Sequence, residues 1–211
     1  MKTLGIIAQK GGAGKTTLSI HLSVQAGLTG LKVLLVDTDP QASATAWWRR
    51  RLEEAPALIQ SHGGLLPGVL NTAAAQGYDL VVIDTAPHSS KEASATARLS
   101  DLVYIPTRPA ILDLDAIGVS TELVTRTGTA AKIVLNSCPP PTRYGEPHIV
   151  SEARQALKAY GIPVSEVAIS QRAAFSHALI DGRAVTEFER KGKAAGEING
   201  LWSALEKEMA L

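Results

Sequence analysis

Short, uninterrupted apolar runs alternate along the chain with longer segments in which apolar residues recur every three or four positions. The runs show no polar alternation, which is typical of strands buried on both faces of a parallel sheet. The longer segments have the spacing of amphipathic helices. We therefore expect an α/β fold, a single domain over residues 1–211, with a mostly parallel sheet flanked by helices on both faces.

Five runs rich in Leu and β-branched residues predict strands, and a weaker run predicts a sixth. The five are Leu4–Ala8, Val33–Val36, Leu80–Ile83, Val103–Ile105 and Ile133–Leu135, and the sixth lies near Val164–Ile169. Helices are expected between and after these runs. They are Lys15–Gly27, Ala42–Glu54, Leu66–Gln76, Glu92–Leu99, Asp115–Arg126, Ile149–Tyr160, Ala173–Asp181 and Lys193–Ala210.

The last expected helix carries an apolar stripe that admits two interpretations. Its members are Ile198, Leu201, Trp202, Leu205 and Met209. Such a stripe either packs on the core or lies on a membrane surface. Membrane-surface helices favour an excess of Lys and Arg, whereas Glu197, Glu206 and Glu208 balance the basic residues here, so core packing is favoured.

Composition leaves the chemistry to short motifs. The formal net charge of +1 excludes a strong constitutive attraction to nucleic acid. A single cysteine, Cys138, excludes a disulfide framework, a Cys-ligated iron–sulfur cluster and a zinc ribbon within one chain. Aromatic residues make up 4% of the chain, too few for a platform that stacks single-stranded nucleic acid. No apolar stretch has the length of a signal peptide core or a membrane span, so a cytoplasmic protein is expected.

A glycine-rich loop follows the first expected strand and runs directly into a helix. Its three glycines let backbone N–H groups point inward as an anion nest, and the helix N-terminus also favours phosphate. In this setting Lys15 reaches the β- and γ-phosphates of a nucleotide, and the Thr16 hydroxyl ligates Mg²⁺. The residues expected to bind the nucleotide here are Lys10, Gly11, Gly12, Ala13, Gly14, Lys15, Thr16 and Thr17.

The loop departs from the general P-loop pattern at its start. That pattern places a glycine where Gln9 stands, and a second lysine, Lys10, occupies the loop entrance instead. A lysine at a strand end is usually a solvated surface group. Beside a site that holds several negative charges, a role in phosphate contact is the stronger interpretation.

Carboxylates follow two of the expected strands. Asp37 and Asp39 follow the second strand, and Asp84 ends the run Leu80–Ile83. Ligands of open α/β sheets bind at the carboxyl ends of strands, and two close carboxylates there suit Mg²⁺. Asp84 has the Walker B position, where a carboxylate holds a water of the magnesium shell. The plainer alternative is that Asp39 starts a turn and Asp37 caps a helix.

Together these motifs resemble the ParA/MinD family of ATPases. The segment Lys10–Thr16 is similar to its deviant Walker A motif, and Asp37–Gln41 is similar to its DxDPQ switch. The resemblance implies a P-loop fold, ATP and Mg²⁺ as cofactors, and an ATP-bound homodimer in which Lys10 touches the phosphates held by the partner subunit. It also implies that Asp39 activates the attacking water and that Asp37 supports the magnesium shell.

Two further sites follow from the same resemblance. The segment Thr85–Ser90 is expected to be a second switch that senses the γ-phosphate. Asn136, at the end of a strand, is expected to recognise the adenine edge, although a turn residue fits that position equally well. The expected catalytic residues are Lys10, Lys15 and Asp39, and the expected metal-site residues are Thr16, Asp37 and Asp84.

A ParA-like role also requires non-specific DNA binding by the ATP dimer, and two basic clusters are candidates. The first comprises Arg172, Arg183, Arg190, Lys191 and Lys193. Doubled in a dimer, it could bind phosphate backbones in a salt-dependent way. The second, Trp47–Arg51, suits nucleic acid or a partner groove. A helix that packs its tryptophans and exposes its arginines is the favoured interpretation of that cluster.

The function expected is therefore that of a weak Mg²⁺-dependent ATPase that partitions or positions DNA or another cargo. The resemblance is greatest to short partition ATPases of the ParF type, which lack an N-terminal DNA-binding domain. A ParB-like or small adaptor protein is expected to stimulate hydrolysis, and the ATP state is expected on the nucleoid with no stable membrane association. The alternatives are a MinD-like membrane-cycling regulator and a biosynthetic P-loop enzyme.

Overall fold

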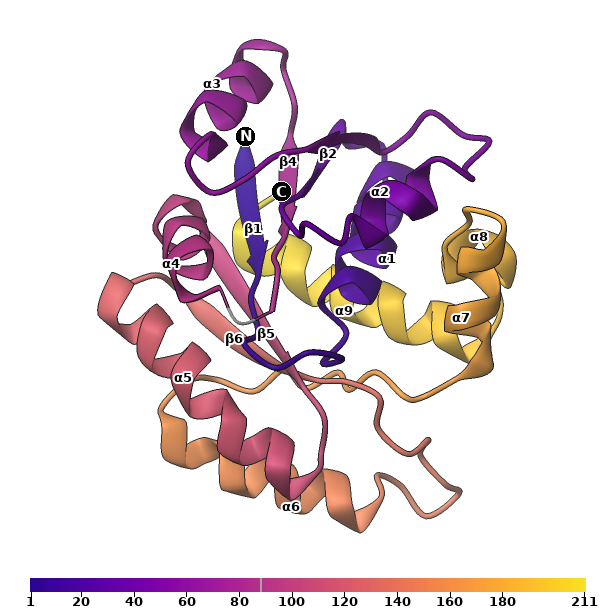
Figure 1. The fold of residues 1–211 in the computed structure, drawn as a ribbon. Helices are drawn as coiled ribbons and strands as arrows, with labels where there is room; N and C mark the ends of the chain where they lie inside the picture. Colours follow the sequence, from indigo (N-terminus) through magenta and orange to yellow (C-terminus); the bar gives the residue numbers. More distant parts are fainter. Residues whose placement is uncertain (88) are drawn as a thin grey trace.

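Six parallel strands form one central sheet (Figure 1). The computed structural model describes residues 1–87 and 89–211. The strand order across the sheet is β3-β2-β4-β1-β5-β6. In chain order the strands are β1 (Lys2–Ile6), β2 (Val33–Asp37), β3 (Ala57–Gln60), β4 (Leu80–Asp84), β5 (Leu102–Thr107) and β6 (Ala131–Leu135).

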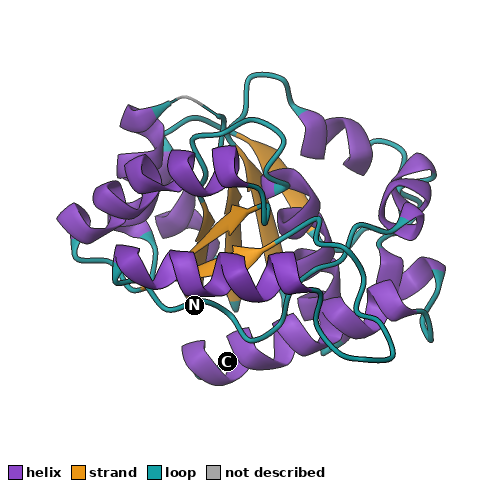
Figure 2. Cartoon of the chain, turned by 90° about the horizontal axis from the view of Figure 1, so that it is seen from below, coloured by secondary structure: helices purple, strands orange, loops and turns teal. Residues whose placement is uncertain are grey.

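Helices cover both faces of the sheet, which lies between them in Figure 2. One face carries α1 (Lys15–Leu28), α2 (Ser43–Trp48), α7 (Ala173–Ile180), α8 (Val185–Phe188) and α9 (Lys193–Met209). The other carries α3 (Leu66–Ala75), α4 (Ser90–Leu99), α5 (Ile111–Thr127) and α6 (His148–Leu157), which a short 3₁₀ turn (Lys158–Tyr160) extends.

Alternation along each strand divides the core between these two layers. In β2, Val33 and Leu35 join the apolar core under α1 and α9, whereas Leu34 and Val36 face α3. Both sets are buried, which explains why the strand reads as a continuous apolar run. The α/β fold, the parallel sheet and its two helical layers are thus confirmed.

Several elements differ from the sequence expectation, among them α8, which was not expected. The expected strand near Val164–Ile169 is wrong, because that segment is bonded to β6 and its extension only near its two ends. β3 was not expected, since an edge strand that is half exposed lacks a continuous apolar run. The second helix ends at Trp48 and not at Glu54, because the residues after it turn to contact the loop before α8.

The C-terminal helix packs on the core, as expected. Ile198, Leu201 and Leu205 are fully buried, and Trp202 and Met209 nearly so. Among the described residues, no helix combines the length and apolar character that a membrane crossing requires. The stripe on α9 is therefore explained by packing within the domain.

Candidate functional site

The glycine-rich loop lies between β1 and α1, at the carboxyl edge of the sheet (Figure 1). Within the described chain, the backbone N–H groups of residues 10–17 donate no hydrogen bond to another protein group. Gly12 and Gly14 have φ values of 73° and 94°, which a side chain would strain. The loop therefore presents a set of free amides at the positive end of α1, as an anion nest requires.

Asn136 and Arg108 hold this loop from the neighbouring strands. The Asn136 amide Nδ2 donates to the Ala13 carbonyl oxygen at 2.8 Å. It lies so close to Gly14 that a Cβ there would stand 1.9 Å from it, so position 14 must be glycine. Arg108, which follows β5, donates to the Gly12 carbonyl. In this structure the Asn136 amide nitrogen braces the loop, and adenine recognition by Asn136 stays a prediction.

Beneath the loop, Lys15, Ser19 and Asp84 form a buried polar group. Ser19 Oγ lies 3.1 Å from Asp84 Oδ1, while Asp84 Oδ2 has no hydrogen-bond partner among the described residues. Burial raises the pKa of Asp84 to about 7, and the nearby carboxylate of Asp37 adds to this, whereas the Thr16 and Ser19 hydroxyls and Lys15 oppose it. Burial lowers the pKa of Lys15, against the attraction of Asp84 and Asp39. The site thus holds charges that the protein alone leaves incompletely compensated.

The aspartate that ends β2 and the one two residues after it have different surroundings. Asp37 is fully buried and sits opposite Asp84 in the strand register. Its Oδ2 accepts hydrogen bonds from the Thr45 amide at 2.9 Å and the Thr45 hydroxyl at 2.8 Å, so it braces the first turn of α2. Asp39 is half exposed and faces the nucleotide cavity, and among the described residues its carboxylate accepts only a local hydrogen bond from the Gln41 amide. The Asp39 carboxylate is therefore available to a ligand. Asp37 stabilises the start of α2, which is the helix-capping alternative that the sequence also allowed.

Lys10 is turned away from the loop that it introduces. Its ammonium lies 3.1 Å from Asp113 Oδ2, at the start of α5. The Asp113 side chain is only 10% exposed, whereas that of Lys10 is 38% exposed. Among the described residues, the nucleotide cavity of the same chain is lined without Lys10. The lysine thus stands beside its own site and not in it.

A cavity of about 410 Å³ opens above the loop. It is lined by the loop, Lys15 and Asp39, and also by Asn136, Arg172 and Phe175. Arg108, Ser170 and Gln171 also line it and were not among the expected site residues. In the sequence, the position of Arg108 directly after an expected strand was the only indication that it lies near the nucleotide cavity. It belongs to no motif whose spacing predicts contact with phosphate.

The residues present suit a magnesium ion held together with phosphate. The orphaned Oδ2 of Asp84 marks a buried carboxylate that a cation would compensate. Within residues 1–87 and 89–211, no cluster of three or more His, Cys, Asp or Glu forms a self-sufficient metal cage. Mg²⁺ commonly binds through one or two carboxylates plus substrate phosphates, so this donor set fits it. The expected second switch, Thr85–Ser90, includes His88, which lies outside the described residues.

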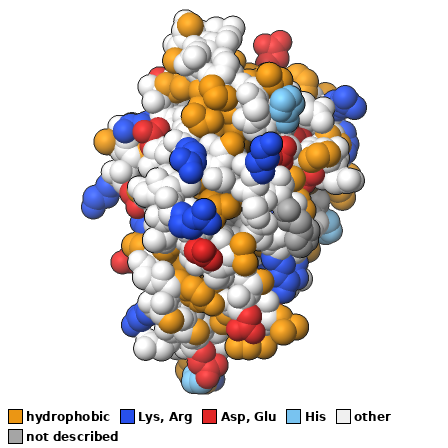
Figure 3. Space-filling model, turned by 60° about the vertical axis from the view of Figure 1, so that its left-hand side comes forward, with side chains coloured by type: hydrophobic (Ala, Val, Ile, Leu, Met, Phe, Trp, Pro, Cys, Tyr) orange, Lys and Arg blue, Asp and Glu red, His pale blue; other side chains and the backbone are white. Residues whose placement is uncertain are grey.

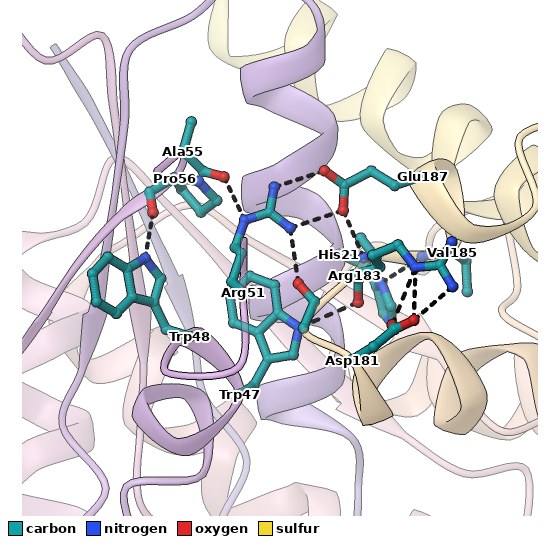
Figure 4. Close-up of polar contacts among 12 residues, drawn as sticks. His21, Trp47, Trp48, Arg51, Ala55, Pro56, Asp181, Arg183, Val185 and Glu187 are labelled. Atoms are coloured by element: carbon teal, nitrogen blue, oxygen red, sulfur yellow. Dashed lines mark hydrogen bonds and ion pairs between the residues drawn. The ribbon is translucent and has the colours of Figure 1, made fainter. Parts of the chain in front are cut away.

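The second basic cluster, Trp47–Arg51, is largely structural (Figure 4). Trp47 and Trp48 donate their indole N–H groups to the Arg183 and Pro56 carbonyls, at 3.2 and 2.9 Å. Arg51 forms a bidentate pair with Glu187, at 2.8 and 2.6 Å. Packing of the tryptophans is confirmed, but the expected exposure of all three arginines is wrong, since the Arg51 side chain is 4% exposed. We call Trp47, Trp48, Arg51 and Glu187, together with the Gly182 carbonyl to which Arg51 also donates, the Arg51 junction.

The first basic cluster is partly neutralised. Arg172 is bound to Glu197 at 2.6 Å and lines the nucleotide cavity, so its charge is already partly compensated, and its contact with DNA stays a prediction. Arg183 is exposed but paired with Asp181 at 2.6 Å. Arg190, Lys191 and Lys193 are exposed, and within the described part of the chain no carboxylate lies within ion-pair distance of them.

Comparison with known proteins identifies relatives along nearly the whole chain. The profile of the CobQ/CobB/MinD/ParA nucleotide binding domain matches residues 4–185. The chain is 32% identical over 213 residues to Maintenance of carboxysome distribution protein A from Gloeobacter kilaueensis, covering 99% of this chain and 94% of that protein. It is 32% identical over 214 residues to the protein of the same name from Halothiobacillus neapolitanus, covering 94% of each. Protein ParA of Rhizobium radiobacter is 26% identical over 185 residues, covering 83% and 81%.

Solved structures share the fold at lower sequence identity. Apo McdA from Cyanothece superposes with a TM-score of 0.81 at 18% identity, covering 97% of this chain and 99% of that one. A substituted McdA from Cyanothece in complex with ATP gives 0.76 at 17%, covering 97% and 96%. MinD from Pyrococcus horikoshii complexed with Mg-ADP gives 0.79 at 19%, covering 98% and 96%. Structures with this fold therefore bind ATP and Mg-ADP.

Proposed function

The chain belongs to the ParA/MinD family of P-loop ATPases, and on that premise we propose that it is an ATP-driven positioning switch. In this proposal, two ATP-bound subunits form a sandwich dimer that binds DNA non-specifically. An adaptor protein links the dimer to its cargo and stimulates hydrolysis, which releases the dimer. The observation that carries the proposal is the position of Lys10, which stands beside the nucleotide cavity of its own chain but does not line it.

Lys10 supplies the link between ATP and dimerisation. Its side chain is held by Asp113 and would have to leave that carboxylate to reach phosphate. Because Lys10 does not line the nucleotide cavity of its own chain, it is available to contact the phosphates bound by a second subunit. Lone subunits would then hydrolyse ATP slowly, because part of the phosphate charge stays uncompensated until the dimer forms.

The remaining groups bind and position the nucleotide within one subunit. The free amides of residues 10–17 and the Lys15 ammonium hold the β- and γ-phosphates. Thr16 and Asp84, with Asp37 behind them, would hold Mg²⁺, which supplies charge neutralisation on the triphosphate. Asp39, half exposed in the cavity, orients the attacking water. Asn136 and Arg108 keep the loop in its phosphate-ready shape.

The DNA contact is proposed to lie at Arg190, Lys191 and Lys193. These cations are exposed around the start of α9 and, within the described chain, lack carboxylate partners. A single copy of so small a patch binds DNA weakly, and two copies in a dimer bind with a steeper salt dependence. With a net charge of +1, the protein would hold DNA only in the dimeric state.

The cargo is proposed to be a large protein assembly. The similarity to two proteins named for carboxysome distribution supports this choice, and Protein ParA, at 26% identity, is more distant. The membrane-cycling alternative has no supporting feature among the described residues, since the apolar stripe of α9 is buried.

DNA retention tests the proposal directly. The protein is passed over immobilised non-specific duplex DNA at low salt with Mg-ATP or Mg-ADP. Retention with ATP that is lost with ADP, and lost with ATP in the variant Arg190→Ala/Lys191→Ala/Lys193→Ala, is expected. The exposed pair Arg49→Ala/Lys158→Ala serves as the control. Equal retention in both nucleotides, or none in either, contradicts the DNA-binding part.

A further inference from the structure

A groove between α4 and α5 is not used by the mechanism above. Its volume is about 400 Å³, and it is lined by both helices along their exposed sides. α4 contributes Lys91, Ser94 and Arg98, which share one helix face at spacings of three and four. α5 contributes Val119, Glu122, Leu123 and Arg126 at similar spacings. The two stripes face each other across what we call the α4–α5 groove.

The groove concentrates positive charge that the protein does not neutralise. Lys91, Arg98 and Arg126 are exposed, and no carboxylate of the described residues lies within ion-pair distance of them. Among the described residues, ion pairs hold six other cations, Lys10, Arg51, Lys132, Arg154, Arg172 and Arg183, whereas the three groove cations are left available to a partner. Figure 3, which looks at the side of the molecule carrying α3, α4 and α5, shows Lys and Arg side chains near the middle of that face. Cations so gathered repel one another and attract an anionic partner.

Three other residues of the groove indicate which kind of anionic partner fits it. Glu122 is exposed and lies in the groove among the cations, where its carboxylate repels a phosphate backbone but can accept a hydrogen bond from a peptide N–H. Val119 is 54% exposed, and Leu123 is half-buried beside it. Apolar side chains on a charged groove provide contact area that a peptide can use and a phosphate backbone cannot. A peptide therefore matches the groove better than DNA does.

The length of the groove sets the size of the occupant. Lys91 and Arg98 are seven positions apart on α4, a span of roughly 10 Å at 1.5 Å per residue. An extended peptide covers that distance with about three residues. We propose that the α4–α5 groove binds a short acidic segment of a partner protein, with acidic side chains on Lys91, Arg98 and Arg126 and an apolar side chain on Val119.

The position of α4 gives such a partner access to the nucleotide site. α4 starts six residues after Asp84, at the end of the expected second switch. Its inner face touches β1 so closely that a Cβ on Gly5 would lie 2.7 Å from Ser100 Oγ and 2.9 Å from Thr96 Cγ2. β1 in turn leads into the phosphate loop. Binding in the groove would thus bias α4 and the segments on both sides of the nucleotide, a consequence that rests on the proposed ATPase function.

Binding of a defined peptide tests the surface itself. A fluorescein-labelled peptide of repeated Glu-Glu-Leu triplets is titrated with the protein, and its anisotropy is recorded at low salt. The variant Lys91→Glu/Arg98→Glu/Arg126→Glu is expected to bind at least about tenfold more weakly, equivalent to about 1.4 kcal/mol. The control Arg49→Glu/Lys158→Glu/Lys207→Glu has the same change in net charge at exposed sites elsewhere and is expected to stay within about threefold. Equal losses in both variants, or no peptide binding by the wild type, overturn the proposal.

A second variant separates a peptide site from a general polyanion site. Val119→Ser is expected to weaken binding of the Glu-Glu-Leu peptide and to leave binding of a Glu-Glu-Ser peptide unchanged. DNA retention with ATP is measured on the same proteins. If the groove variant loses DNA while peptide binding persists, the surface is a nucleic-acid site and the proposal is wrong.

A fluorophore in the groove gives a readout that does not depend on activity. Cys138 is 2% exposed, and burial raises its pKa to about 12, so Ser94→Cys would carry the reactive thiol. The peptide is expected to change the emission of a dye at position 94, and an unchanged emission at saturating peptide contradicts docking there. ATP-driven dimerisation is measured on the wild type first, so a failure of the proposed switch is seen separately from a failure of the groove.

Discussion

The Arg51 junction and the nucleotide site both bury charge, but they compensate it to different degrees. At the junction, Arg51 donates hydrogen bonds to the Glu187 carboxylate and to the Ala55 and Gly182 carbonyls (Figure 4). Burial raises the pKa of Glu187, but the hydrogen bonds from Arg51 and from the Ala184 amide outweigh burial and hold that pKa below its usual range. At the nucleotide site, Asp84 keeps an oxygen without a partner, and Lys15 is buried with weak compensation.

This difference indicates that the Arg51 junction stabilises the fold, whereas the nucleotide site needs a bound ligand to compensate its buried charge. A buried ion pair with all its hydrogen bonds made contributes rigidity and needs nothing from outside. A buried carboxylate without a partner costs stability until a cation or proton arrives, which is typical of functional sites. The substitutions below test this division, from the largest expected effect to the smallest.

Lys15→Ala is expected to have the largest effect, and only on the nucleotide side of the comparison. Loss of the phosphate-binding ammonium should lower ATP turnover by more than about 100-fold. Since Lys15 is buried and poorly compensated, the free energy of unfolding should not fall. Steady-state turnover and chemical denaturation measure the two, with Lys158→Ala as the exposed control. Turnover within threefold of wild type would remove Lys15 from the assigned site.

Asp84→Asn is expected to trade activity for stability. The amide has no charge to desolvate, so the free energy of unfolding of the ligand-free protein should rise at pH 8 by up to about 4 kcal/mol, since the pKa is displaced from 3.8 to about 7 and each unit corresponds to about 1.4 kcal/mol. Magnesium-dependent turnover should fall at least about tenfold. Urea denaturation and a magnesium titration of turnover check both. A less stable Asp84→Asn protein would mean that the carboxylate is already well compensated.

Arg51→Ala is expected to act in the opposite sense, on the fold alone. Leaving Glu187 buried without its partner should cost about 3 kcal/mol of unfolding free energy. The double variant Arg51→Met/Glu187→Leu should recover most of that loss, because it removes the pair together. Turnover per folded molecule should be unchanged in both. A loss of turnover at full folding would connect the junction to catalysis and break the comparison.

Per pH unit, the smallest effects are those on the pH dependence of stability. Asp84 has a folded pKa of about 7, above its ordinary 3.8, so its contribution to stability falls as pH rises from about 4 through 7. Burial lowers the pKa of His21 from 6.5 to about 3, so its contribution is lost as pH falls from 6.5 toward 3. Denaturation of Asp84→Asn and His21→Gln against wild type should show difference slopes of opposite sign, about 1.4 kcal/mol per pH unit. Parallel slopes would contradict these assignments.

Much of the fold was readable from sequence because its strands are buried on both faces. Continuous apolar runs predicted β1, β2, β4, β5 and β6. β3 was not predicted because it lies at the edge of the sheet, is half exposed and so lacks such a run. The end of α2 escaped because the Arg51 junction, a contact across more than a hundred residues, turns the chain there. Local pattern carries no signal for such a contact.

The site divides in the same way. Gly11–Thr16, Asp37, Asp39 and Asp84 are found by local spacing, since strand ends and a glycine turn fix them. Other contacts of the site depend on elements that are distant in sequence. They are the ion pairs Lys10–Asp113 and Arg172–Glu197 and the hydrogen bond from Arg108 to the Gly12 carbonyl. A charge pattern alone does not distinguish an arginine without an ion-pair partner from one that is paired with a carboxylate beside the nucleotide cavity.

The molar mass of the Asp39→Ala protein in solution with Mg-ATP tests the central claim most directly. Without the residue proposed to orient water, ATP should persist and the dimer should accumulate. The account predicts a mass of two subunits for Asp39→Ala with ATP, one subunit with ADP, and one subunit for Lys10→Ala/Asp39→Ala with ATP. A dimer that persists in the double variant, or a monomer in Asp39→Ala with bound ATP, would contradict the role of Lys10 across the interface.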